Sequence, residues 1–583
     1  MSEEILTEEL NKDVLSYREK LQLNTPDDEL VRAVDKAMKE SIDLKDKIDK
    51  IGIKNKRYWI SGTEKEAQDF HPAKAKITAN RIFADVETAI PILTSEPPEP
   101  TILGKFDNDT KDRIQKALQL AYEVKYQMQQ KLQKMIRNWY IYRVGILKYR
   151  WGKKGFVTEV VLPKKVGMDK YATSKENCEF IWDELEDTLE NLEKKFPKQK
   201  DFLKQVAGDN PKAKIKYIEF WGGNGEWVCW KLRDRILDKM KNPNWDYDNI
   251  DNNIFDTPQF PYIFLNVFNL GDESGFYDDT SLIEQAAPIQ EGVSQLERQI
   301  LDLNEGQKRV WVVSSQAMSE TKAQALVNET GDLLVYLDRG APAGSVGQVQ
   351  SGKPDASLFN HLSHLLAEID NIIGMHSTTR GERAQQETLG GRQLLMSSDY
   401  GRLDLIVRNV EQVVEEWYNA YLHMVKVYSD IGDTLYDTKT NEEIRLTGEM
   451  IPKGITIMVK KGSTLPTDEV TKRANAIQLA QFGMIDPTTL FEEMSYTNTD
   501  KRTQDLYNWL VMTGKIQPPQ QPSPATGQAQ PTIAGQAQQP DQDSRARQVA
   551  RINQILQSEQ FKQLSPEEQL QITGRAKEIL NQM

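Results

Sequence analysis

The chain has 583 residues, of which 38% are hydrophobic, so several folded domains with apolar cores are possible. A formal net charge of −13 argues against a protein that grips nucleic acid over its whole surface, because such binding needs clustered lysine and arginine. The two cysteines make no disulfide framework and favour a reducing compartment, and no apolar run is long enough to cross a membrane.

The first 143 residues favour helices. Residues 27–51 carry apolar side chains at three- and four-residue steps, and residues 79–102 read as a helix that a proline-rich segment ends. Residues 107–143 predict one long helix.

Strand patterns follow. Residues 145–151 and 155–163 predict a pair of strands around a Gly/Lys turn. Residues 213–234 predict a hairpin, because two aromatic and β-branched runs flank a Gly-Gly-Asn-Gly loop. Residues 260–279 predict a buried strand and a turn.

Two segments show an apolar seam of the kind found in helices packed side by side. In residues 281–304 the seam is Leu282, Ala286, Ile289, Val293, Leu296, Ile300 and Leu303. In residues 355–373 it is Leu358, Leu362, Leu365, Ile369 and Ile372. Asp355 suits the start of the second helix and Gly374 its end.

Both seam segments are acidic. Residues 281–304 hold four acidic residues and one basic residue, net −3, and residues 355–373 hold three acidic residues and no Lys or Arg, net −3. Such a pair of helices carries a net charge of −6 and repels phosphate. A site that binds nucleic acid tightly needs the opposite charge.

A small insert separates the two seams. Residues 308–315 predict a strand, 319–329 a helix and 331–338 a second strand, followed by a loose tail at 339–354. After the second seam, the polar segment 374–391 begins and ends on glycine, and loops of that length inside a domain are usually functional.

The rest of the chain alternates element types. A third helix runs from the end of the polar loop to about residue 429, strands occupy 434–462 and helices return in 466–514. Residues 516–541 are Gln/Pro-rich and almost uncharged, which predicts a disordered linker. Residues 542–583 resume a helical pattern.

Enzyme chemistry finds little support. Residues 347–353 fit the start of a phosphate-binding loop, but Pro354 stands where Ser or Thr must bind magnesium. His361 and His364 lie three apart on a predicted helix without further metal ligands at suggestive spacing. We therefore expect no catalytic residue, no metal site and no cofactor.

In its order of segments the chain resembles the portal proteins of tailed bacteriophages, the head–tail connectors, and most of all those of short-tailed phages. The stretches that carry the resemblance are NKRYWISG (55–62), 79–100, 215–227, 260–300 and LAQFGMIDPTTLFEEM (479–494). The resemblance implies an α+β, mainly helical, portal-type fold with a wing, a stem, a clip and a crown, forming a ring of about twelve copies around a central channel.

Placed on this sequence, the resemblance implies the following parts. They are wing 1–280, first stem helix 281–304, clip 305–354, second stem helix 355–373, tunnel loop 374–391, remainder of the wing 392–465, crown 466–515, linker 516–541 and terminal helices 542–583 as a crown extension or barrel.

Three groups of site residues follow from this placement. The DNA-facing tunnel loop would use His376, Thr378, Thr379, Arg380, Arg383, Gln385 and Gln386. The acidic channel wall would use Glu284, Glu291, Asp302, Glu368 and Asp370. Contacts of the clip with neighbouring copies and with the terminase would use Trp311, Val313, Leu334 and Tyr336.

The implied function is a non-enzymatic channel at one capsid vertex of the virion, assembled in the host cytoplasm. Double-stranded DNA would pass through it during packaging and ejection. The implied partners are other copies of the chain, the packaging terminase, the major capsid protein or a scaffold, and tail adaptor proteins, with no membrane. The alternatives are a coiled-coil-rich scaffolding protein without a channel, and an ATP-driven or nuclease component of packaging.

Overall fold

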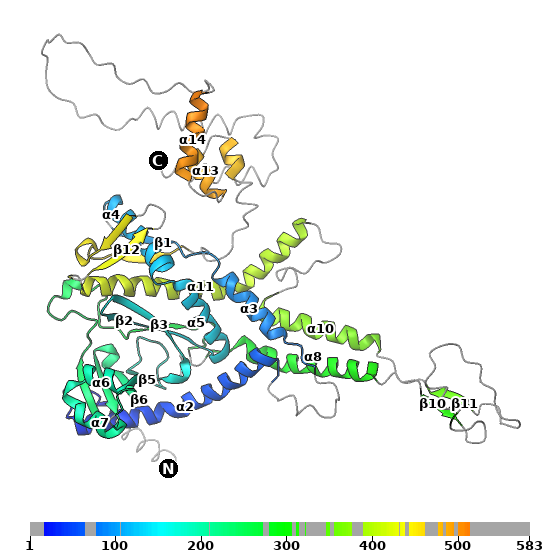
Figure 1. The fold of residues 1–583 in the computed structure, drawn as a ribbon, viewed down its shortest axis with the longest axis horizontal. Coiled ribbons are helices and arrows are strands. Elements are labelled where there is room, and N and C mark those ends of the chain that lie inside the picture. The colour runs from blue at the N-terminus through cyan, green and yellow to red at the C-terminus, as the bar shows by residue number, and fades with distance from the viewer. Residues whose placement is uncertain are drawn as a thin grey trace, which may run out of the picture. The chain divides into compact units, whose positions relative to one another are not determined.

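The computed structural model describes residues 17–63, 77–104, 106–208, 210–271, 279–305, 310–313, 321, 346–349, 355–375, 389–428, 430, 432–437, 442–460, 476–481, 485–494 and 499–512. The chain divides into two compact units, Met1–Pro466 and Thr467–Met583, and each is described by itself. Both helices and strands form the first unit, as the sequence predicts (Figure 1).

The two helices predicted near the N-terminus are present. Helix α2 spans Asp27–Ser61, with three acidic residues in its first turn, and ends at Gly62, whose left-handed backbone (φ 70°) lets its N–H bind Tyr58 O. Helix α3 spans Arg81–Leu93, and the Asn80 side chain accepts a hydrogen bond from the Phe83 N–H, which caps its start.

The prediction of one long helix over 107–143 is wrong. The segment forms α4 (Asn108–Leu120), one π-helical turn (Ala121–Lys125) and α5 (Met128–Tyr142), with Gln127 left-handed at φ 47°. The cause is tertiary. Tyr126, at the break, donates its hydroxyl hydrogen to Asp433 over 2.7 Å and packs edge-on against Tyr421.

Two antiparallel sheets follow α5. In the first, the central strand β2 (Gly145–Gly152) pairs with β3 (Gly155–Val161) and with β9 (Tyr262–Leu265), which confirms the first predicted strand pair. The second has five strands in sequence order, which are β4 (Val166–Met168), β5 (Phe180–Thr188), β6 (Lys214–Gly222), β7 (Trp227–Leu232) and β8 (Arg235–Lys241).

The predicted hairpin over 213–234 is the β6–β7 pair, with Gly222 opposite Trp227. Two short helices, α6 (Leu189–Lys195) and α7 (Lys200–Ala207), lie between β5 and β6 in the chain.

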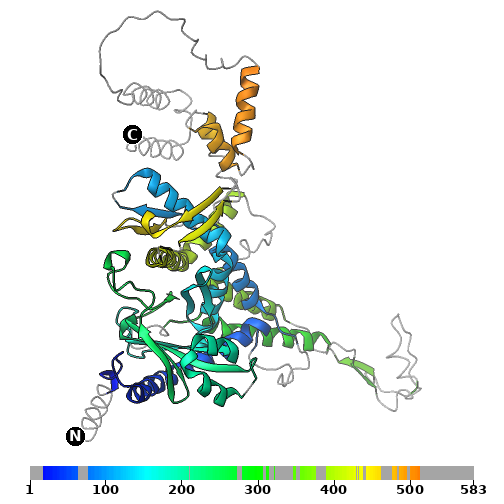
Figure 2. The same ribbon diagram turned by 60° about the vertical axis from the view of Figure 1, so that its left-hand side comes forward.

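The two seam segments form helices that lie side by side (Figures 1 and 2). Helix α8 spans Leu282–Glu305 and α10 spans Ala356–Ile373. Asp355 accepts a hydrogen bond from the Ser357 N–H and caps α10, and Gly374 ends it with φ 82°. Both helices and both signals agree with the sequence analysis.

The insert between these helices contains an antiparallel strand pair. Strand β10 (Val310–Val313) was predicted, but its partner β11 (Val346–Val349) lies in the segment predicted as a loose tail. That tail prediction is wrong for β11, whose two end residues, Val346 and Val349, pair with Val313 and Val310 of β10. Apart from position 321, the helix predicted at 319–329 and the strand predicted at 331–338 lie outside the described residues.

Helix α11 spans Leu389–Val427, so it begins inside the segment predicted as loop. Its C-terminal half passes through an aromatic cluster in which Trp417 and Tyr421 stack at 5.7 Å. Strands β12 (Asp433–Asp437) and β13 (Glu442–Leu446) pair with each other. Strand β14 (Thr456–Val459) pairs with β1 (Pro100–Leu103) from far earlier in the chain.

In the second unit, α13 (Pro487–Glu493) and α14 (Thr499–Met512) pack against each other. Asp486 caps the start of α13, because its carboxylate accepts a hydrogen bond from the Thr489 N–H over 3.3 Å. The predicted linker 516–541 and terminal helices 542–583 lie outside the described residues.

Candidate functional site

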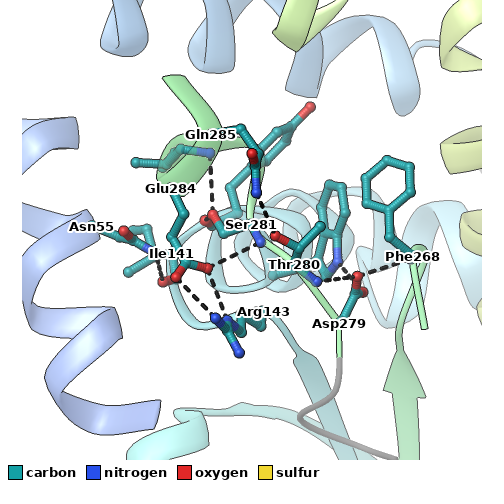
Figure 3. A network of polar contacts seen from close by, with 12 residues as sticks. Asn55, Ile141, Arg143, Phe268, Asp279, Thr280, Ser281, Glu284 and Gln285 are labelled. Atoms are coloured by element: carbon teal, nitrogen blue, oxygen red, sulfur yellow. Dashed lines mark hydrogen bonds and ion pairs between the residues drawn. The ribbon is translucent and has the colours of Figure 1, made fainter. Parts of the chain in front are cut away.

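The seam helices α8 and α10 and their attachment to the rest of the first unit form the candidate site. The start of α8 is fixed by a reciprocal cap between Ser281 and Glu284 (Figure 3). The Ser281 hydroxyl oxygen accepts a hydrogen bond from the Ile283 N–H at 3.2 Å, and the Glu284 carboxylate accepts one from the Ser281 N–H at 3.2 Å. This capping box leaves few free donors at the helix start.

Arg143 holds the same glutamate from the end of α5. Its Nε and Nη2 donate to the two Glu284 carboxylate oxygens at 2.8 and 3.0 Å (Figure 3). Arg143 has a left-handed backbone (φ 68°), which turns the chain from α5 into β2. Two-point guanidinium–carboxylate pairs are strong and directional, so this contact sets the position of α8 on α5.

Asp279, two residues before α8, fixes the approach to that helix. Its carboxylate accepts hydrogen bonds from the Trp139 indole at 2.9 Å and from the N–H groups of Val267, Phe268 and Thr280 at 2.7–2.8 Å (Figure 3). The side chain is 1% exposed. Burial raises the pKa of Asp279, while the four donors oppose that rise.

The end of α10 is held by α3. Arg81 donates from Nε and Nη2 to the two Asp370 carboxylate oxygens at 2.9 and 3.0 Å. The Arg81 N–H also donates to Gln290 of α8 at 3.2 Å, and the Gln290 side-chain amide donates to Ala79 O. One short segment therefore contacts both seam helices.

Further along α8, two more polar contacts continue this attachment. Thr63 donates its hydroxyl hydrogen to Glu291 at 2.8 Å, and the Arg298 Nε donates to Ile77 O at 2.9 Å. These contacts join α8 to the residues that follow α2 and precede α3.

The apolar seam is only partly buried. Four of the seam residues are buried, which are Ala286, Val293, Ile300 and Ile369. The other eight are half-buried, which are Leu282, Ile289, Leu296, Leu303, Leu358, Leu362, Leu365 and Ile372. On α10 only Ile369, Asp370 and Ile373 are buried, and Phe359 is 46% exposed. The pair thus leaves apolar surface open in the isolated chain.

The structure changes the expectation for the acidic wall. Glu284 and Asp370 are paired with Arg143 and Arg81, and Asp370 is only 7% exposed. Both carboxylates therefore help to hold their helices on the body of the unit, and the channel wall at these two positions stays a prediction. Of the other three, Glu291 is half-buried beside Thr63, Asp302 is half-buried and Glu368 is exposed.

The remaining candidate residues are only partly placed. Trp311 and Val313 lie in β10, opposite Gln348 and Val346 of β11. Leu334, Tyr336 and the tunnel-loop residues His376, Thr378, Thr379, Arg380, Arg383, Gln385 and Gln386 lie outside the described residues.

The structure also bears on the alternatives. Gly347, Gln348 and Val349 of the sequence that resembles a phosphate loop lie in strand β11, not in a turn before a helix. His361 and His364 are exposed on α10. Over the described ranges, no group of three or more metal-binding side chains occurs, and no helix is both long and apolar enough to span a bilayer.

Sequence reasoning missed Arg81, Arg143 and Asp279. The Ser281–Glu284 cap carried a readable signal, Ser-x-x-Glu before an apolar run, which marks a helix start. The partners of the two arginines carried none, because they lie more than a hundred positions away in the chain.

A comparison with family models matches residues 255–560, just over half of the chain, to the family described as "Phage SU10 portal protein". The matched segment contains both seam helices, the insert between them and α11, so the class is that of bacteriophage portal proteins, the head–tail connectors of virions. The chain belongs to the phage SU10 portal protein family.

No curated protein matches the chain. Among solved structures the chain is similar to one described as "Neck of empty GTA particle computed with C6 symmetry", with 9% identity and a TM-score of 0.38, over 72% of this chain and 90% of that chain. A likeness at this level carries no argument of its own.

Proposed function

We propose that copies of this chain form a ring at the portal vertex of the capsid, with α8 and α10 as the stem around a DNA channel. Residues 305–354 are the clip, 374–391 the tunnel loop, 1–280 and 392–465 the wing, and 466–515 the crown. The family match supports the portal role, and the order of two packed helices around a small insert supports this assignment.

The exposed apolar face of α10 is the main support for a ring of copies. Helix α10 has no Lys or Arg and an apolar composition, yet only three of its residues are buried in the isolated chain. Soluble proteins rarely leave such a face open unless another protein covers it. Neighbouring copies of the same helix pair, arranged in a closed ring, cover it without a new partner.

The charge of the stem supports a channel that does not hold DNA. The two helices carry −6 by sequence, and Arg81 and Arg143 offset two of those charges, leaving about −4 per copy. Asp302 and Glu368 are the acidic positions that we assign to the channel wall. Repeated around a ring, like charge keeps phosphate from adhering.

The partners follow from the portal role. Double-stranded DNA passes the channel, the terminase docks on the clip during filling, and tail adaptors replace it afterwards. Capsid or scaffold proteins contact the wing, assembly takes place in the host cytoplasm, and the ring itself performs no catalysis. Arg380 and Arg383 in the tunnel loop make brief contacts with passing phosphates, and Trp311 and Val313 in β10, with Leu334 and Tyr336, serve clip contacts.

Electron microscopy of the purified chain tests the proposal. End-on views should show a perforated disc, and native mass measurement should give one multiple of the chain near twelve copies. Pore-free rods would favour the scaffolding alternative, and monomers alone at micromolar concentration would contradict the ring.

A further inference from the structure

A cavity of about 730 Å³ in the first unit is lined by residues of both antiparallel sheets. The strands β2 and β3 supply one part of its lining, and β5, β6 and β7 supply another. The cavity belongs neither to the stem nor to its attachment, and the proposed function does not use it.

Three buried charged groups lie at this cavity. The Lys148 ammonium group is 3.0 Å from Asp183 Oδ2 and 2.6 Å from Glu219 Oε1, and all three side chains are buried. Both carboxylate oxygens of Glu219 also accept a hydrogen bond, because the indole N–H groups of Trp221 and Trp230 donate to them at 2.9 and 2.8 Å. Two carboxylates share one ammonium group, so the cluster has one excess negative charge.

Asp183 is the carboxylate left short of partners. It is 1% exposed and lines the cavity, and no described residue donates a hydrogen bond to its Oδ1. Burial raises the pKa of Asp183 despite Lys148. At Glu219 burial is also the largest single influence, but Lys148, the Trp221 hydrogen bond and Lys195 together outweigh it and lower the pKa to about 2. A buried acceptor without a donor is costly, which marks this oxygen as a place for a ligand.

The lining is also aromatic. Trp151 contributes an indole N–H that has no acceptor, and its ring stacks on Tyr428 at 4.9 Å. The Lys195 ammonium group lies 4.6 Å from the centre of the Trp230 ring. The chain itself therefore already places a cation against this aromatic wall.

The charge of the whole lining is negative. Four basic side chains line the cavity, which are Lys148, Arg150, Lys165 and Lys195. Six acidic side chains line it, which are Glu159, Asp183, Glu184, Glu186, Asp187 and Glu219, so the net charge is −2. A cationic ligand reduces this imbalance, and an anionic one increases it.

We propose that this cavity binds a guanidinium group, which donates a hydrogen bond to Asp183 Oδ1 and stacks against the indole rings. A guanidinium group is planar and weakly hydrated, so it enters a desolvated aromatic site at lower cost than an ammonium group. The group belongs either to an arginine side chain of a partner protein or to a free small guanidine. The inference stands independently of the ring.

Isothermal titration calorimetry on the full-length chain tests the site. The probes are the peptide acetyl-Gly-Arg-Gly-amide, the same peptide with citrulline in place of arginine, and methylguanidine. Citrulline keeps the shape and removes the charge. We expect the arginine peptide to bind at least tenfold more tightly than the citrulline peptide. Equal affinities, or no heat from either guanidinium probe at millimolar concentration, would overturn the proposal.

Two variants locate the binding. Asp183→Asn keeps the shape and should weaken the arginine peptide at least tenfold, whereas Asp238→Asn, exposed on β8 and outside the cavity, should leave it unchanged. If Asp183→Asn does not fold, Trp151→Phe keeps an aromatic ring but gives a smaller face for stacking, and should weaken binding severalfold. Unchanged affinity in the folded variant would refute the site.

The two guanidinium probes distinguish the sources. A peptide that binds much more tightly than methylguanidine indicates an arginine within a protein segment, because the flanking backbone then contributes. Comparable affinities indicate a free small guanidine. Either result supports the guanidinium site.

Discussion

Arg81 and Asp370 are 289 positions apart in the chain and form a two-point ion pair, with Nε–Oδ1 and Nη2–Oδ2 distances of 2.9 and 3.0 Å. The pair joins α3 to α10, while the Arg81 N–H binds Gln290 on α8. A single arginine thus touches both helices of the proposed stem.

Replacing Asp370 with Asn should loosen α10 from α3. The Arg81 side chain is 20% exposed and keeps Asp85 at 3.5 Å as a charged partner, so loss of the two-point pair should cost about 2 kcal/mol. Amide hydrogen exchange of α10 peptides measures this as a lower local opening free energy. As a control, Asp404→Asn breaks the exposed Arg408–Asp404 pair and should cost less than about 1 kcal/mol.

Gly52 tests whether side-chain packing or helix propensity has the larger effect on stability. A Cβ at this position in α2 would lie 2.1 Å from the ring of Tyr142, which is 6% exposed. Alanine raises helix propensity by about 1 kcal/mol, but overpacking costs about 1–3 kcal/mol, so Gly52→Ala should lower the melting temperature.

Gly292 in α8 is the matched control for Gly52. Its added Cβ would meet only the end of the Leu365 side chain, at 3.3 Å. Gly292→Ala should therefore leave the melting temperature unchanged or raise it. If Gly52→Ala raised the melting temperature and Gly292→Ala lowered it, helix propensity and not packing would determine the stability effect at Gly52.

These contacts show what the sequence determines. The seam spacing and the signals at Asp355 and Gly374 were sufficient to place α8 and α10, because helix periodicity and caps are local. The break at Tyr126 was not predictable, since it depends on Asp433 and Tyr421 more than 290 positions away. For the same reason, counting acidic residues could not reveal that Glu284 and Asp370 already have arginine partners.

His423 should make the first unit sensitive to acid. It is buried, accepts a hydrogen bond from the Ile254 N–H at 3.1 Å, and makes a second bond to Asn244 O. Burial lowers its pKa from 6.5 to about 4. The unfolded chain binds more protons in that interval, so stability is lost as the pH falls below 6.5, by about 2 kcal/mol between pH 7.5 and 5.

Thermal melting across this pH range checks the role of His423. The variant His423→Gln should be less stable at pH 7.5, because it loses part of this bonding. Its melting temperature should fall less steeply toward pH 5 than that of the wild type. Parallel pH profiles for the two proteins would exclude His423 as the source.

Phe359 on α10 tests the proposed subunit contact. The side chain is 46% exposed in the isolated chain, so Phe359→Asp should leave the fold intact. If neighbouring copies cover it, a buried unpaired charge should reduce the ring fraction at micromolar concentration at least tenfold by native mass measurement. Ile250→Asp, at a 73% exposed position, should leave the ring unchanged.

The tunnel loop is tested without shortening it. Replacing Arg380 and Arg383 together by alanine keeps the spacing between Gly374 and Leu389, and should preserve the ring while reducing the packaged or retained DNA severalfold. Quantification of encapsidated DNA measures the effect. Loss of the ring itself would assign the segment a structural role instead.

The attachment of the stem also has a mechanical consequence. Arg143 binds the start of α8, and Arg81 binds the end of α10. A force along either helix is therefore transmitted to the same helical body through two neighbouring ion pairs. Helices α8 and α10 must therefore tilt together as one rigid unit. In the proposed ring, sliding between copies would then occur at the exposed apolar faces of these helices.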